Sequence, residues 1–120
     1  MSASTQNTLP DPALVLGKAT LRAAQRMGLS RQELTEVIGR DRSSISRAGI
    51  DPASKAGELS ALLLRCYRSL AVLVDDDANQ LREWLGTPNH HTGGIPREQL
   101  RSVDGLVSVS RYLDAIRGAH

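Results

Sequence analysis

GLSRQELTEVIGRDRSSISR, residues 28–47, is the stretch that decides the fold of this chain. Ser30 and Glu33 have the spacing of a capping box, in which each side chain satisfies a free backbone N–H at the start of a helix. Gly39 follows the apolar residues of that helix and can adopt the left-handed conformation that often ends one. Asp41 is then suited to cap a second helix. The stretch predicts two short helices joined by a tight turn over residues 39–41.

The apolar residues of this stretch are spaced to hold the two helices at a steep angle. They are Leu29, Leu34, Val37, Ile38 and Ile45. The pattern resembles a helix-turn-helix of the Cro/repressor type, in which the second helix lies in the major groove of DNA. An ordinary helical hairpin with a solvated charged face has similar spacing, so the outer residues carry the functional interpretation.

Arginine and serine side chains occupy the expected outer face of the second helix. An arginine can form two hydrogen bonds with guanine, and serine can bond bases or phosphates. The residues expected to contact bases are Arg42, Ser43, Ser46 and Arg47. Phosphate contacts, which position a protein without reading sequence, are expected from Arg31, Gln32 and Arg40. Arg40 stands where this motif usually has an apolar residue, so its aliphatic stem is expected to cover the turn.

Composition favours helices throughout the 120 residues. The chain is 40% hydrophobic but only 2% aromatic and has no Phe, so its core must be built from Leu, Val, Ile and Ala. Residues 1–50 hold seven Lys/Arg against four Asp/Glu, or +3, whereas residues 51–120 hold eight against nine, or −1. The basic excess therefore falls on the half with the helix-turn-helix. A single cysteine, Cys66, excludes an intramolecular disulfide. No secretory leader or membrane-spanning stretch is visible, which favours the cytoplasm.

Helical periodicity extends outward from this stretch and predicts an all-α chain with six or seven helices. We expect a disordered lead-in over residues 1–12, a helix-turn-helix region over 13–53 and a small helical domain over 54–120. The first helix, from Ala13 to Met27, is expected to bury an apolar face. That face comprises Leu14, Leu21, Ala24 and Met27.

The longest helix is expected over residues 54–74 and has a broad apolar stripe. The stripe comprises Leu59, Leu62, Leu63, Cys66, Leu70 and Leu73. It is broader than one small domain needs, and helix-turn-helix proteins commonly pair two half-sites. We therefore expect a homodimer with part of this helix near the contact.

A second stretch, EWLGTPNHHTGGIPREQL over residues 83–100, raises the question of a metal or catalytic site. His90 and His91 are adjacent and have no third ligand at a spacing typical of zinc sites. No serine or cysteine stands with a histidine and an acid in a recognisable catalytic arrangement. The sequence therefore predicts no metal, no cofactor and no catalytic residue, and the loop is expected to be a connector turned by its Gly-Gly pair.

The order of residues in this second stretch carries a family resemblance. Trp84-Leu85, Pro88-Asn89, Gly93-Gly94, Pro96 and Leu100 are followed by a closing helix with Leu106, Val109, Leu113 and Ile116 on its inner face. This succession resembles the C-terminal toxin-binding domain of the Xre/MbcA/ParS antitoxins. The resemblance spans roughly residues 58–117, and the preceding helix-turn-helix suits the same family.

The resemblance implies a non-enzymatic antitoxin of a type II toxin–antitoxin pair. Its partner would be a RES-domain toxin that consumes NAD, and the antitoxin would cover the toxin's active site. It would also bind operator DNA as a dimer within a larger toxin–antitoxin assembly. The polar row of the closing helix is then expected to bind the toxin through Ser108, Arg111, Asp114, Arg117 and His120. The alternatives are a stand-alone helix-turn-helix repressor without a toxin and, with less support, a small enzyme.

Overall fold

The computed structural model describes residues 9–118, and within them all regular structure is helical apart from one isolated antiparallel bridge between Asn89 and Gly94. This confirms the all-α fold class. Seven helices lie in the described part of the chain: α1 Pro12–Met27, α2 Arg31–Ile38, α3 Arg42–Ala48, α4 Lys55–Leu73, α5 Ala78–Gly86, α6 Pro96–Gln99 and α7 Val103–Gly118.

The helix ends are fixed by local side-chain caps, as the sequence predicts. The Ser30 hydroxyl accepts from the Glu33 backbone N–H at 3.0 Å, and the Ser30 N–H donates back to the Glu33 carboxylate at 2.8 Å. The Asp41 carboxylate accepts from the Ser44 backbone N–H at 2.7 Å. Gly39 ends α2 with a φ of 81°, in the left-handed region that glycine adopts without strain. The predicted turn between α2 and α3 is therefore confirmed.

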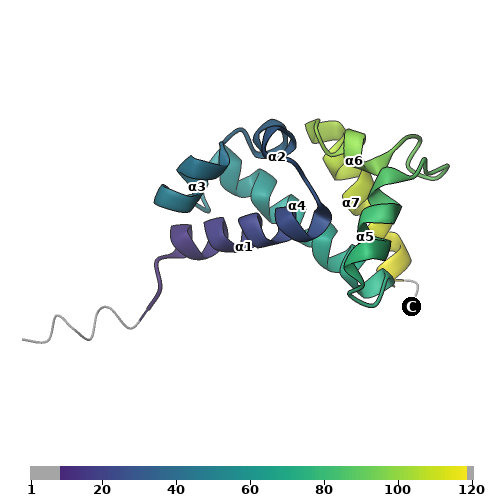
Figure 1. Cartoon of the computed structure of the whole chain (residues 1–120), viewed down its shortest axis with the longest axis horizontal. Coiled ribbons are helices and arrows are strands. Elements are labelled where there is room, and N and C mark those ends of the chain that lie inside the picture. Colours follow the sequence, from purple (N-terminus) through teal and green to yellow (C-terminus); the bar gives the residue numbers. More distant parts are fainter. Residues whose placement is uncertain (1–8, 119–120) are drawn as a thin grey trace, which may run out of the picture.

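Helix α4 is the axis of the molecule, because it contacts helices from both ends of the chain. Figure 1 shows α1, α2 and α3 gathered around its first half and α5, α6 and α7 around its second half. Its most extensive packing partner is α7, followed by α1. None of the helices in the described part of the chain is long and apolar enough to cross a membrane.

The broad stripe of α4 is covered within the chain, which corrects the reason given above for a homodimer. Leu59, Leu63, Cys66 and Leu70 are buried by the surrounding helices, Leu62 is half-buried and only Leu73 is exposed. The stripe is wide because α4 packs on both α1 and α7, not because a second copy must cover it. Burial raises the pKa of the Cys66 thiol to about 12, with a further contribution from the Asp114 carboxylate. The thiol therefore behaves as an inert core residue.

The inner face of α1 differs from the predicted one at its start. Leu21 is half-buried and Ala24 and Met27 are buried as expected, but Leu14 is 47% exposed. The inward positions of the first turns are instead small: Gly17 and Thr20 are buried. A Cβ on Gly49, whose φ is 74°, would lie 2.3 Å from the Ala13 carbonyl oxygen. This close approach holds the end of α3 against α1.

Candidate nucleic-acid and partner interfaces

The side chains predicted to contact bases lie together on the outer face of α3. Arg42, Ser43, Ser46 and Arg47 are all exposed, while Ile45 between them is buried. Asp41 caps the helix, so the first turn of α3 is presented outward with its backbone bonds satisfied. This is the arrangement that a recognition helix requires, because its first residues must reach base edges.

The start of α2 lies beside the start of α3 and adds further polar side chains. A shallow hollow with a volume of about 260 Å³ separates the two helix starts. It is lined by Arg31, Gln32, Thr35, Asp41, Arg42 and Ser43. The fold thus brings the expected phosphate-contacting residues Arg31 and Gln32 next to the expected base-contacting ones. Both are exposed.

Arg40 is half-buried at the turn, and its guanidinium is bonded to α3. Its Nε and Nη2 atoms donate to the Ser44 hydroxyl at 3.1 and 2.6 Å. The side chain therefore lies along the turn, as expected from its position, and ties the turn to the recognition helix. Its role as a phosphate contact stays a prediction, since the guanidinium has further N–H donors.

An ion-pair clamp that was not predicted from the sequence joins α6 and the residues just after it to α2. The Arg97 guanidinium donates to both carboxylate oxygens of Glu33, at 2.7 and 2.8 Å, and also to the carbonyl of Gly28. Arg101 donates to the Glu36 carboxylate at 2.7 Å. The two acids are three residues apart on one helix, and the two arginines are four residues apart. Glu33 and Glu36 therefore lie on one face of α2, and both ion pairs join that face to the segment that contains Arg97 and Arg101.

Glu33 has two functions in this clamp. Its carboxylate completes the capping box of α2 and also receives the bidentate bond from Arg97. The Arg97 hydrogen bond lowers the pKa of Glu33 from 4.5 to about 2, against the opposing effect of burial. Correspondingly, the pKa of Arg97 is raised, mainly by its hydrogen bond to Glu33. The helix-turn-helix is therefore fastened to the C-terminal helices through the cap of α2.

A second pair of contacts fastens α1 to the C-terminal half. Arg82 of α5 donates to the carbonyls of Gln25 and Arg26 at 2.8 and 3.1 Å. Both carbonyls lie in the last turn of α1, beyond the regular helical N–H partners, and the Gln25 carbonyl also accepts from the capping Gly28 N–H. Arg26 in turn forms an ion pair with Asp76 at 2.7 Å, in the corner between α4 and α5.

The closing helix α7 presents part of the expected polar row. Ser108, Arg111 and Arg117 are exposed, and Leu106, Val109 and Leu113 are buried as predicted, with Ile116 half-buried. His120 lies outside the described residues.

Asp114 was expected to point outward and does not, which corrects the predicted row. Its carboxylate faces α4, where it accepts from Arg65 Nε at 2.8 Å and from the Ser69 hydroxyl at 3.3 Å. Of the predicted row within the described residues, two arginines and a serine are exposed, and Asp114 holds α7 to α4.

The loop after α5 packs on α7 through stacked rings. The His91 imidazole stacks on Tyr112 with ring centroids 5.4 Å apart, and Trp84 stacks on the same Tyr112 at 6.5 Å. The Asn89 side chain accepts from the backbone N–H groups of His91 and Thr92, which shapes the turn before Gly93. The loop is therefore the connector that the sequence predicts, but Tyr112 as its docking partner was missed. No group of three potential metal ligands occurs among residues 9–118.

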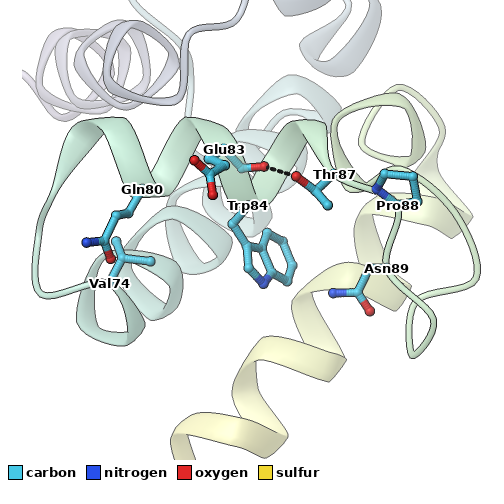
Figure 2. Close-up of a pocket in the computed structure, with 7 residues that line it drawn as sticks. All are labelled: Val74, Gln80, Glu83, Trp84, Thr87, Pro88 and Asn89. Carbon is cyan, nitrogen blue, oxygen red and sulfur yellow. Dashed lines mark hydrogen bonds between the residues drawn. The ribbon is translucent and has the colours of Figure 1, made fainter.

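An open groove with a volume of about 560 Å³ runs beside this stack. Figure 2 shows the Trp84 indole over the groove, with the Thr87 hydroxyl bonded to the Glu83 carbonyl at 2.6 Å. The groove is lined by Val74, Gln80, Glu83, Trp84, Thr87, Pro88 and Asn89. Trp84 is half-buried and so offers an aromatic surface to a partner.

A helix-turn-helix with an exposed Arg/Ser-rich second helix, joined to a second small helical domain, is the architecture typical of a class of DNA-binding proteins. Two family models match the chain. The antitoxin Xre-like helix-turn-helix domain matches residues 9–65, and the antitoxin Xre/MbcA/ParS C-terminal toxin-binding domain matches residues 69–119. The chain belongs to the Xre-type antitoxins. No curated protein matches it significantly. Both matches reach into α4, which therefore belongs to neither domain alone.

Proposed function

We propose that this antitoxin neutralises a RES-domain, NAD-consuming toxin by covering its active site, and that it binds operator DNA as a homodimer to regulate its own operon. The protein acts in the cytoplasm and is not itself an enzyme, in keeping with two matched families that are generally non-enzymatic. The observation that carries the proposal is the presence, on one chain, of an exposed Arg/Ser-rich recognition helix and a toxin-binding domain with an exposed cationic helix face.

The DNA half of the proposal rests on the first two turns of α3. Arg42 and Arg47 are exposed at opposite ends of the helix, with Ser43 and Ser46 between them. An arginine that reads guanine contributes about 1–3 kcal/mol of discrimination, whereas one that contacts phosphate weakens binding to all sequences alike. Arg42→Ala and Arg47→Ala therefore separate the two kinds of contact.

The toxin half rests on the exposed side of α7. Arg111 and Arg117 are six residues apart and exposed, so both can reach a partner without opening the core. Guanidinium groups are well suited to pair with carboxylates or to contact polar groups at the entrance of a cleft. Leu106, Val109 and Leu113 meanwhile hold the helix in place, so its shape is fixed before the partner arrives.

Co-expression with the toxin encoded in the same operon tests the proposal. We expect the pair to purify as a complex, the antitoxin to preserve cellular NAD, and Arg111→Ala/Arg117→Ala to weaken toxin binding while the chain stays folded. Anisotropy with the upstream palindrome is expected to show a sequence preference that falls steeply with salt. A chain that binds the operator but leaves the toxin active would instead be a stand-alone repressor.

A further inference from the structure

An apolar groove with a cationic rim lies between α1 and α4, on surface that the functions above leave unused. The groove has a volume of about 350 Å³, and its floor is formed by Val15, Ala19, Ala23 and Leu64. Its rim carries the three cations Lys18, Arg22 and Arg68. None of these cations makes an ion pair within residues 9–118. The groove is therefore suited to a segment that is apolar in the middle and acidic at one end.

The same chain presents such a segment at the end of α4. Val72 is 63% exposed and Leu73 is 39% exposed, and after Val74 come Asp75 and Asp76. We call Val72, Leu73, Asp75 and Asp76 the acidic corner. The φ angles of the two aspartates are 54° and 59°, a left-handed conformation that non-glycine residues adopt at a cost. Asp75 makes no ion pair within the described residues, and Asp76 remains largely exposed beside Arg26.

We propose that the acidic corner of one copy docks into the basic groove of a second copy, and that this reciprocal contact forms the antitoxin homodimer. The inference rests on the proposed homodimer and identifies its surface. Charge and polarity both match: Val72 and Leu73 meet the apolar floor, and Asp75 meets the rim of Lys18 and Arg22.

The geometry of α4 makes the contact reciprocal. Leu64 and Arg68 line the groove, and Val72 lies one and two turns further along the same helix face. The groove and the corner are therefore separated by about seven residues of helix, or roughly 10 Å at 1.5 Å per residue. Two α4 helices that pair antiparallel around a twofold axis near residue 70 place each corner on the other groove. A twofold contact of this kind uses the same patch on both copies and closes at two.

The proposed contact lies away from the recognition helix. Figure 1 shows α3 at one end of the molecule and α6 toward the other. The residues that line the groove come from α1 and the middle of α4. A dimer built on α4 thus presents two recognition helices. The contact adjoins Arg117, which lines one hollow with Val72 and Leu73.

A charge swap tests the proposal. Arg22→Glu and Asp75→Arg, each alone, place like charges together and are expected to raise the dimer dissociation constant at least about tenfold. The double variant restores the opposite charges in reversed order and is expected to recover the wild-type constant. Lys55→Glu makes the same charge change as Arg22→Glu at the far end of α4, where Lys55 forms an ion pair with the nearby Glu58, and serves as the control. Sedimentation equilibrium over a wide concentration range measures all four, with circular dichroism to confirm folding.

The outcomes separate this surface from the wider proposal. A raised dimer dissociation constant in both single variants, with the wild-type constant recovered in the double variant, supports the contact. If the wild type is dimeric and both single variants match Lys55→Glu, the dimer uses another surface and this inference is overturned, while the homodimer stands. A monomeric wild type overturns both. If the wild type is monomeric and Arg22→Glu loses affinity for the toxin, the occupant of the groove is the toxin. Anisotropy with the operator and co-purification with the toxin test the two binding proposals in separate experiments.

Discussion

Arg97→Ala removes the bidentate partner of Glu33 and is expected to lower the free energy of unfolding by about 2 kcal/mol. This magnitude follows from the Glu33 pKa, which the Arg97 bond, with smaller contributions from Ser30, lowers from 4.5 to about 2. A shift of that size corresponds to roughly 3 kcal/mol in favour of the charged form at pH 7. The Arg97 and Glu33 side chains are 30% and 16% exposed, so partial solvent screening reduces the expected loss.

The pH dependence of this loss has a definite sign. Because the folded pKa of Glu33 lies below its unfolded value, the stabilisation is fully present above pH 4.5 and is lost as the pH falls through about 2. In Arg97→Ala the pKa of Glu33 returns toward its ordinary value. The stability difference between wild type and variant is therefore largest at neutral pH and is expected to fall to roughly half at pH 3.

Denaturant unfolding followed by circular dichroism and by the single tryptophan measures the difference at each pH. Arg101→Ala is the matched control, because Arg101 pairs with Glu36 one turn along the same face but is more exposed, so its loss should be much smaller. Glu33→Gln keeps a side chain that can complete the capping box. In that background Arg97→Ala should cost little. Equal losses for Arg97→Ala and Arg101→Ala, or a difference independent of pH, would refute the reasoning.

Three further changes test other parts of the structure by the same unfolding measurement. Leu113→Ala opens the core between α4 and α7 and should cost about 2–5 kcal/mol, so a surface-sized loss would contradict its burial. Gly49→Ala forces a Cβ against the backbone of Ala13 at a φ of 74° and should cost about 1–3 kcal/mol; a neutral result would refute the close approach. Asp75→Gly relieves a left-handed aspartate and should stabilise the monomer by up to about 1 kcal/mol when unfolding is measured at a concentration too low for dimerisation; destabilisation of the monomer would contradict the cost of that conformation.

The sequence predicted the helix ends well because each is determined within three or four residues. Ser30 and Glu33 recognise each other across one turn, and Asp41 caps α3 through the Ser44 N–H. These local bonds need no knowledge of the rest of the fold. The exposed α3 residues followed from the same reasoning, since a helix whose apolar positions are inward must present the others to solvent.

The error at Asp114 has a different origin. Ser110, one turn before it, is buried although it is polar, and Ser69 of α4 is buried opposite. The inward face of α7 therefore includes small polar positions that hydropathy does not detect. A residue one turn after Ser110 lies on nearly the same face, so Asp114 points at α4 and not at solvent. For the same reason, hydropathy did not predict the first part of the inner face of α1, where the buried residues are Gly17 and Thr20.

The clamp was out of reach of sequence reasoning because its partners lie 64 and 65 residues apart. One arginine on a short helix, another just after it and two glutamates on α2 are ordinary surface residues until the fold places them together. The two glutamates are three residues apart and the two arginines four residues apart, but such spacings are common in the chain and do not predict a contact.

The clamp also affects how the two domains can work together. The match to the helix-turn-helix domain ends at residue 65 and the match to the toxin-binding domain begins at residue 69, both within the single helix α4. A continuous helix resists bending, and the pairs Arg97–Glu33 and Arg82 with the end of α1 close the structure on either side of it. The direction of α3 relative to α7 is therefore set by covalent continuity and by ion pairs together. In a dimer that forms through α4, the same rigid helix sets the separation of the two recognition helices. The last part of that helix also belongs to the toxin-binding domain match.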